Sequence, residues 1–211
     1  MKLFTTPASP WTRKCIVSIM ELGIEDKVER ISTRWPHAWA TKTIAFAPEF
    51  AAATPVGRIP ALVTDDGLRL CESFAIVDYL DAEYGNHRLL PQAGPQRWRL
   101  QSILSIANGL LEAQILRRGE LLRKDGERSD DFLQKMCERE ARCYDAIEDM
   151  VDWFEADVDL AQITLGVSCS YADFRFPNED WKTGRPNLTR WFERFIQRPS
   201  MQATMPRETP Q

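Results

Sequence analysis

The hydrophobic pattern of the chain changes its period near residue 90. In the first part, short apolar runs alternate with segments of helical spacing, which predicts strands and helices in turn. In the last part, apolar residues recur at helical spacing only. Residues 85–95, rich in Gly, Asn, Gln and Pro, separate the two. The sequence therefore predicts an α/β domain over residues 1–84, a linker over residues 85–95 and an all-helical domain over residues 96–211.

The α/β part is predicted to run strand, helix, strand, loop, strand, strand, helix. The expected elements are strands at Lys2–Thr5, Val28–Ser32, Pro60–Thr64 and Leu68–Cys71, helices at Pro10–Leu22 and Glu72–Glu83, and an irregular stretch at Thr33–Gly57. Asp66-Gly67 between two apolar runs is a strong hairpin signal. Gly23, just after the first periodic segment, is a typical helix stop.

The second part is predicted to be helical throughout. The expected helices are Gln96 to about Lys124, Ser129 to about Glu155, Leu160–Tyr171 and Pro186–Gln197. The polar, proline-bearing end, Met201–Gln211, is expected to lie over the surface.

Composition narrows the classes of function. The net charge of -4, with both signs interspersed, argues against a nucleic-acid binder. No apolar run approaches the ~20 residues of a membrane span, and Met1 to Phe4 lead into a strand and not into a signal peptide. Five scattered cysteines without a C-x-x-C pair argue against a disulfide framework and a zinc site. We expect reduced thiols and a cytoplasmic protein.

Ser9 stands where the first helix is expected to begin, with Pro10 at the first helical position. A serine there commonly caps the helix by accepting a backbone N–H. The same hydroxyl has a proton to donate, and the helix N-terminus offers a positive dipole end and unpaired N–H groups, so this place can also stabilise a thiolate. The two roles are compatible. Thr5 and Thr6 are alternatives for the hydroxyl that meets the sulfur.

Five motifs, in order along nearly the whole chain, resemble those of the cytosolic glutathione S-transferase family, particularly bacterial members with a Ser-Pro-aromatic active-site turn. The motifs are SPWTRK (Ser9–Lys14), VGRIPAL (Val56–Leu62), CESFAIVDYLDAEYG (Cys71–Gly85), LAQITLGVSCSYADFRF (Leu160–Phe176) and GRPNLTRWFERFIQRPSMQAT (Gly184–Thr204). The resemblance implies a thioredoxin-like α/β N-terminal domain plus an all-α C-terminal domain, the glutathione S-transferase fold.

The chain departs from the family pattern in two places. The family's capping box usually has Ser or Thr, then Asp three residues later, where this chain has Asp159 and Gln162; Asp can still cap and Gln can still reach back. The segment between the second strand and Val56 is also longer than usual, so no residue in it is assigned to glutathione.

The resemblance also implies roles for individual residues. Ser9 would be the catalytic residue. The implied glutathione-binding residues are Trp11, Arg58, Ile59, Pro60, Glu72 and Ser73, and the implied second-substrate pocket holds Trp11, Leu104 and Asn108. No metal and no cofactor are implied, because glutathione is the co-substrate.

Each implied contact has a chemical reason. A cis Ile59-Pro60 bond would turn the main chain of Ile59 towards a peptide ligand, which then pairs as an added strand. Glu72 can pair with the ammonium of the γ-glutamyl group, and Ser73 at the helix start can bind its carboxylate. Arg58 either meets the glycine carboxylate of glutathione or is solvated.

The sequence therefore predicts a transferase, usually homodimeric in this family, that activates glutathione for attack on a small, apolar electrophile in detoxification. Two alternatives stay open. One is a binding or regulatory protein that keeps the fold without catalysis. The other is a glutathione-dependent reductase that uses Cys15. The second is disfavoured because residue 9 is serine, which cannot form a mixed disulfide, and because Cys15 is expected inside the helix.

Overall fold

The computed structural model of the protein describes residues 1–33, 48–154 and 156–208. The chain divides into two compact units, one of Met1–Gln92 with the segment that starts at Ala203, and one of Ala93–Gln202. A sheet-bearing first unit and a helical second unit confirm the fold class expected from the sequence. The domain bounds and the linker stay a prediction.

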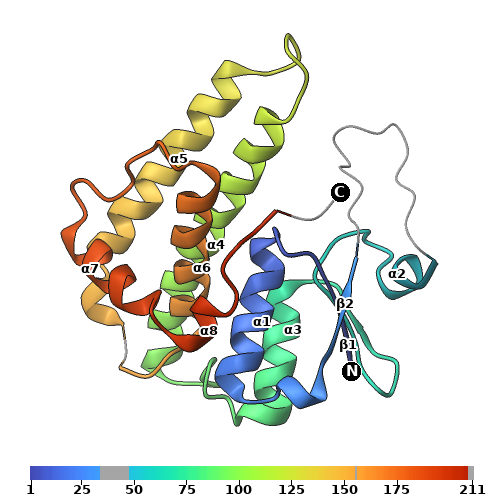
Figure 1. Cartoon of the computed structure of the whole chain (residues 1–211). Coiled ribbons are helices and arrows are strands. Elements are labelled where there is room, and N and C mark those ends of the chain that lie inside the picture. Colours follow the sequence, from blue (N-terminus) through green and yellow to red (C-terminus); the bar gives the residue numbers. More distant parts are fainter. Residues whose placement is uncertain (34–47, 155, 209–211) are drawn as a thin grey trace. The chain divides into compact units, whose positions relative to one another are not determined.

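A four-stranded sheet with the order β2-β1-β3-β4 forms the centre of the first unit (Figure 1). Its strands are β1 (Lys2–Thr5), β2 (Glu29–Ser32), β3 (Ala61–Val63) and β4 (Arg69–Leu70). β1 pairs in parallel with β2 and antiparallel with β3, which pairs antiparallel with β4. The predicted hairpin is confirmed. Its turn holds Gly67 at a φ of 87°, which glycine adopts without a Cβ clash.

Two helices, α1 (Pro10–Leu22) and α3 (Ser73–Leu80), pack against each other beside the sheet (Figure 1). α1 begins and ends where the sequence predicts, because Ser9 caps its first turn and Gly23 closes it at a φ of 69°. α3 begins one residue later than predicted, since Glu72 is its N-cap.

Short helical turns complete the first unit. A 3₁₀ turn, η1 (Glu25–Lys27), precedes β2, and a π-helical turn, η2 (Asp81–Gly85), follows α3. The carboxylate of Asp81 is fully buried and accepts hydrogen bonds from the N–H groups of Leu89 and Leu90, at 3.0 and 2.7 Å. These bonds fix the chain that leaves the first unit.

The stretch expected to be irregular contains a helix, α2 (Pro48–Ala53). Its first residue is a proline, which suits the first helical position because a backbone N–H there would have no partner within the helix. It ends in alanines, which have the highest helix propensity. Phe50 is buried, with its ring centroid 5.7 Å from that of Phe4 in β1. The prediction of an irregular segment is therefore wrong for α2. Trp35 and Trp39 lie outside the described residues.

The second unit is helical, as predicted. Its elements are α4 (Pro95–Leu121), α5 (Asp130–Glu148), η3 (Val151–Trp153), α6 (Leu160–Arg175), α7 (Pro186–Phe195) and α8 (Pro199–Gln202). α4 packs against α5 and α6. Every residue from Leu160 to Ala172 is buried, so α6 is the core helix of this unit. No helix in the described part of the chain has both the length and the apolar character needed to cross a bilayer.

Side-chain caps begin two of these helices. Ser129 Oγ accepts from the N–H of Phe132 at 3.2 Å, at the start of α5. Asp159 Oδ1 accepts from the N–H of Gln162 at 2.8 Å, at the start of α6, so the altered capping box does cap. The amide of Gln162 donates to the carbonyl of Asp157 at 3.0 Å.

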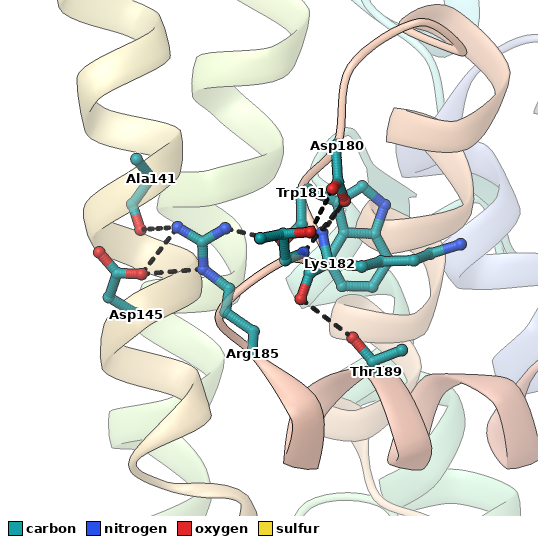
Figure 2. Close-up of polar contacts among 8 residues, drawn as sticks. Ala141, Asp145, Asp180, Trp181, Lys182, Arg185 and Thr189 are labelled. Carbon is teal, nitrogen blue, oxygen red and sulfur yellow. Dashed lines mark hydrogen bonds and ion pairs between the residues drawn. The ribbon is translucent and has the colours of Figure 1, made fainter.

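Arg185 holds the loop between α6 and α7 to α5 (Figure 2). Its guanidinium binds one carboxylate oxygen of Asp145 through Nε at 2.8 Å and through Nη2 at 2.7 Å. The same group donates to the carbonyl oxygens of Trp181 and Ala141. One planar side chain with several donors thus ties the α6–α7 loop to α5 and to itself.

The end of the chain differs from the prediction. Met201 is fully buried in α8, so the segment does not simply lie over the surface. The segment from Ala203 then joins the first unit, where Thr204 contacts Arg13 of α1.

Candidate active site

Three segments of the first unit meet at one end of the sheet, the end at which β1 stops after Thr5. We call it the exit end. α1 begins there after a short turn. Because β3 runs opposite to β1 with Ala61 paired to Phe4, the chain enters β3 at the exit end, directly after Pro60. β4 runs opposite to β3 and therefore ends there, directly before α3. The candidate residues of the N-terminal part thus lie in segments that share one end of the sheet.

Ser9 caps α1 at the exit end. Its Oγ accepts from the N–H of Thr12 at 3.3 Å, and its own N–H donates to the carbonyl of Thr6 at 3.2 Å. Among the described residues, no acceptor is found for the Ser9 hydroxyl proton. The hydroxyl can therefore cap the helix and still donate a proton to an anion.

The two alternatives to Ser9 have different surroundings. Thr5 is buried, and its hydroxyl donates to the carbonyl of Ile31 at 3.3 Å, so that proton is already used. Thr6 is also buried. Ser9 is half-buried and lies at the N-terminus of a 13-residue helix. It is therefore better placed than Thr5 or Thr6 to bind an anion.

Trp11 lies in the first turn of α1, and the VGRIPAL residues enter β3 at the exit end. Trp11 is half-buried, and the ammonium of Lys14 lies 4.9 Å from its ring centroid. The Ile59-Pro60 bond is cis, as expected. Ile59 packs partly against the cluster around Phe4 and Phe50, whereas Arg58 is exposed.

Glu72 and Ser73 start α3 at the exit end. Glu72 Oε2 accepts from the N–H groups of Phe74 and Ala75 at 2.7 and 3.2 Å, and Oε1 accepts from the hydroxyl of Ser73 at 3.0 Å. The carboxylate of Glu72 is exposed and held in one orientation. The N–H of Ser73, at the first helical position, has no partner within the helix. A carboxylate that can bind a cation and an N–H that can donate a hydrogen bond to an anion thus lie side by side.

Leu104 and Asn108 belong to α4 of the second unit. Leu104 is buried and Asn108 half-buried. Their membership of a second-substrate pocket with Trp11 stays a prediction.

Cys15 is buried in α1, and its thiol lies near the start of α3. Burial raises the pKa of Cys15 to about 12, and this effect is larger than the opposing effect of the nearby Lys14. A thiol of this kind holds almost no thiolate near neutral pH and is a poor nucleophile. The geometry therefore does not support a reductase that uses Cys15.

Arg13 and Lys14 were not assigned a role from the sequence. Both are buried, at 4% and 0% exposure, although two adjacent cations normally face solvent. Burial lowers the pKa of Arg13 to about 10 and also lowers the pKa of Lys14. No local pattern in the sequence indicates that Arg13 is buried, because its partner Thr204 lies 191 positions away.

Within the described residues, no group of three His, Cys, Asp or Glu side chains is placed to hold a metal ion.

Two sequence comparisons cover most of the chain. Residues 8–83 match the glutathione S-transferase N-terminal domain, and residues 122–194 match the glutathione S-transferase C-terminal domain. The GST-like protein YibF of Escherichia coli strain K12, itself uncharacterised, is 27% identical over 209 residues, 98% of each chain. Glutathione S-transferase GstB of the same strain is 31% identical over 166 residues, covering 72% of this chain and 76% of GstB.

Solved structures agree with these matches. A glutathione transferase family member from Pseudomonas fluorescens Pf-5, with bound glutathione, superposes with a TM-score of 0.90 at 31% identity, covering 98% of this chain and 99% of the other. A glutathione S-transferase from Methylobacillus flagellatus KT, with glutathione bound, gives a TM-score of 0.85 at 26% identity, with 98% and 99% covered.

Proposed function

Since this chain belongs to the glutathione S-transferase family, we propose that it is a glutathione transferase, an enzyme that activates the thiol of glutathione for attack on a small electrophile. The observation that carries the proposal is the convergence of three segments at the exit end: the N-terminus of α1 with Ser9, the main chain at Ile59, and the pair Glu72-Ser73.

The chemistry begins at Ser9. Glutathione gives its thiol proton to solvent, and the sulfur anion is stabilised by the Ser9 hydroxyl and by the N-terminal dipole of α1. The anion then forms a carbon–sulfur bond with the electrophile, and the leaving group departs with the electron pair of the broken bond. The hydroxyl proton of Ser9 suits this role because no described residue accepts it.

The remaining residues hold the tripeptide. The main chain of Ile59 pairs with the cysteinyl part, the fixed carboxylate of Glu72 takes the ammonium, and the N–H of Ser73 takes the γ-glutamyl carboxylate. The Ser73 hydroxyl, which now donates to Glu72, is a second donor for that carboxylate. Arg58 is exposed and is a candidate for the glycine carboxylate. Trp11, Leu104 and Asn108 remain candidates for the electrophile pocket.

The wider proposal follows the family. It includes a homodimer, a cytoplasmic location and a role in detoxification, with an apolar electrophile as second substrate.

The deciding experiment compares two capping serines. Ser9 and Ser129 both accept one backbone N–H at a helix start, so Ser9→Ala and Ser129→Ala should each cost about 1 kcal/mol of stability. Only Ser9→Ala should reduce turnover of a chlorodinitrobenzene-type electrophile, by about 10²–10³-fold. It should also return the pKa of bound glutathione towards about 8.5.

Retention on immobilised glutathione separates the possible failures. If the wild-type protein is not retained and turns over no electrophile, the non-catalytic alternative replaces the proposal. If it is retained and active but Ser9→Ala keeps full turnover, glutathione transfer stands and the role of Ser9 is wrong.

A further inference from the structure

Lys14 places a positive charge in the interior of the first unit. Its side chain is completely buried, although lysine is one of the residue types that are almost never buried in this way. Burial lowers the pKa of its ammonium, because the charged form loses its hydration. An apolar side chain of the same length would fill the same space without the cost of burying a charge. The charge itself is therefore the feature to explain.

The ammonium of Lys14 contacts the first turn of α1. Its Nζ lies 4.9 Å from the ring centroid of Trp11, three residues earlier in the helix. Side chains of a helix lean towards its N-terminus, which brings Lys14 to a ring of the preceding turn. Attraction between a cation and an aromatic ring is stronger when the cation is removed from water. Trp11 is half-buried, so Lys14 restrains this indole from inside the unit.

The start of α3 also lies within electrostatic range of Lys14. The charged groups that act on its ammonium are the thiol of Cys15, in the same helix, and the carboxylate of Glu72, the N-cap of α3. α1 packs against α3, and both helices begin at the exit end. The charge of Lys14 therefore adds to the positive dipole ends of these two helix starts.

We propose that Lys14 is a positioning residue of the candidate site, whose buried ammonium fixes the indole of Trp11 and serves as the internal counter-charge for the anion bound at the start of α1. The inference rests on the proposed function, because that anion is the sulfur of glutathione. A buried charge is screened much less by water and salt than a charge at the surface. The ammonium of Lys14 therefore lowers the pKa of the bound thiol.

The test is a pH titration of the thiol of bound glutathione, followed by the ultraviolet absorbance of the thiolate. Lys14→Met keeps the length and the apolar stem but loses the charge, so it should raise this pKa by about 1 pH unit. Below both pKa values, kcat at saturating glutathione should fall about 10-fold with the thiolate fraction, and above both the rates should converge. Lys14→Arg keeps the charge and the ring contact and should restore most of the wild-type profile.

Lys27→Met is the matched control. Lys27 Nζ lies 5.7 Å from the ring centroid of Tyr84 in the same unit, but Lys27 is exposed. The substitution removes the same charge from another pair of a lysine and an aromatic ring, and it should leave the thiol pKa unchanged. Lys14→Met should change the melting temperature little, because removal of a buried charge offsets the lost ring contact. Lys14→Gln is a second neutral variant for the same titration, in case methionine does not fit.

The outcomes are distinct. A raised thiol pKa in Lys14→Met and Lys14→Gln, with Lys14→Arg and Lys27→Met as in the wild type, supports the inference. An unchanged thiol pKa in the neutral variants, or a loss of rate that is equal at every pH, overturns it while the proposed function stands. A wild-type protein that does not bind glutathione, or binds it with a thiol pKa still at about 8.5, overturns the proposed function, and the inference with it.

Discussion

The thiol of Cys15 donates a hydrogen bond to the carbonyl oxygen of Ser73, across 3.8 Å. The second turn of α1 therefore rests against the first turn of α3. This contact lies near the two helix starts at the exit end, where Ser9 and Glu72 are the N-caps. We therefore expect Cys15 to pack the two helices together and not to react in the candidate site.

This assignment predicts the behaviour of Cys15 variants. Cys15→Ala should keep most of the turnover and lose about 1 kcal/mol of stability, because it removes one buried sulfur. In the native protein, an alkylating reagent at neutral pH should modify the half-buried Cys71, Cys137 and Cys143 before Cys15, whose pKa is raised to about 12 by burial. Mass spectrometry of the modified peptides measures this. Rapid native labelling of Cys15, or a Cys15→Ala variant without activity, would revive the reductase alternative.

Glu140 makes the stability of the second unit depend on pH. It lies 3.3 Å from Arg117, which also binds Glu179 at 2.8 Å. Burial raises the pKa of Glu140 from 4.5 to about 7, against the opposing pull of Arg117. Folding therefore favours the protonated acid. Its contribution to stability is complete below the pKa of the unfolded chain and is lost as pH rises through the pKa of the folded one.

We accordingly expect the free energy of unfolding to fall by about 1–3 kcal/mol from about pH 5 to about pH 7.5 through this group. Urea denaturation at a series of pH values measures the slope. Glu140→Gln should flatten it, because the amide does not titrate. Glu138→Gln, at an exposed position of the same helix, should leave it as in the wild type. Equal slopes in the wild type and Glu140→Gln would show that Glu140 is ionised in both states.

Two glycines in helices should respond to alanine in opposite directions. A Cβ at Gly166 of α6 would lie 2.5 Å from ring atoms of Phe195, which is buried and stacks on Trp191. Gly166→Ala should therefore cost about 1–3 kcal/mol. A Cβ at Gly109 of α4 would meet nothing within 4 Å. Gly109→Ala should gain about 0.5–1 kcal/mol from helix propensity alone. Urea midpoints of both variants decide the matter, and a destabilised Gly109→Ala would contradict the packing described for α4.

Local signals were enough to predict α1. Its cap, its proline and its closing glycine all lie within the segment itself, so no distant contact was needed. The β3–β4 hairpin was predictable for the same reason, because Asp66-Gly67 specifies the turn. α2 was missed because six residues are too few to show a helical period.

Distant contacts account for other differences. The helix expected to run to about Glu155 ends at Glu148, whose carboxylate instead accepts from the N–H groups of Asn187 and Leu188 at 3.0 and 2.7 Å. That partner lies about forty positions away in sequence. The contact between Arg13 and Thr204 spans most of the chain, so nothing near Arg13 indicated that it would be buried.

Glu72 has two possible tasks, and one substitution separates them. As an N-cap, Glu72 accepts two backbone N–H groups, which an amide oxygen can also accept. As the partner of the glutathione ammonium, it needs the negative charge. Glu72→Gln should therefore change the melting temperature little and raise the KM for glutathione about 10-fold or more.

A glutathione analogue that lacks the α-amino group supplies the second half of a double-mutant cycle. It should bind the wild type and Glu72→Gln equally well, because the charge has lost its partner. If the analogue discriminates between the two proteins as strongly as glutathione does, Glu72 acts only as a cap and the ammonium is bound elsewhere.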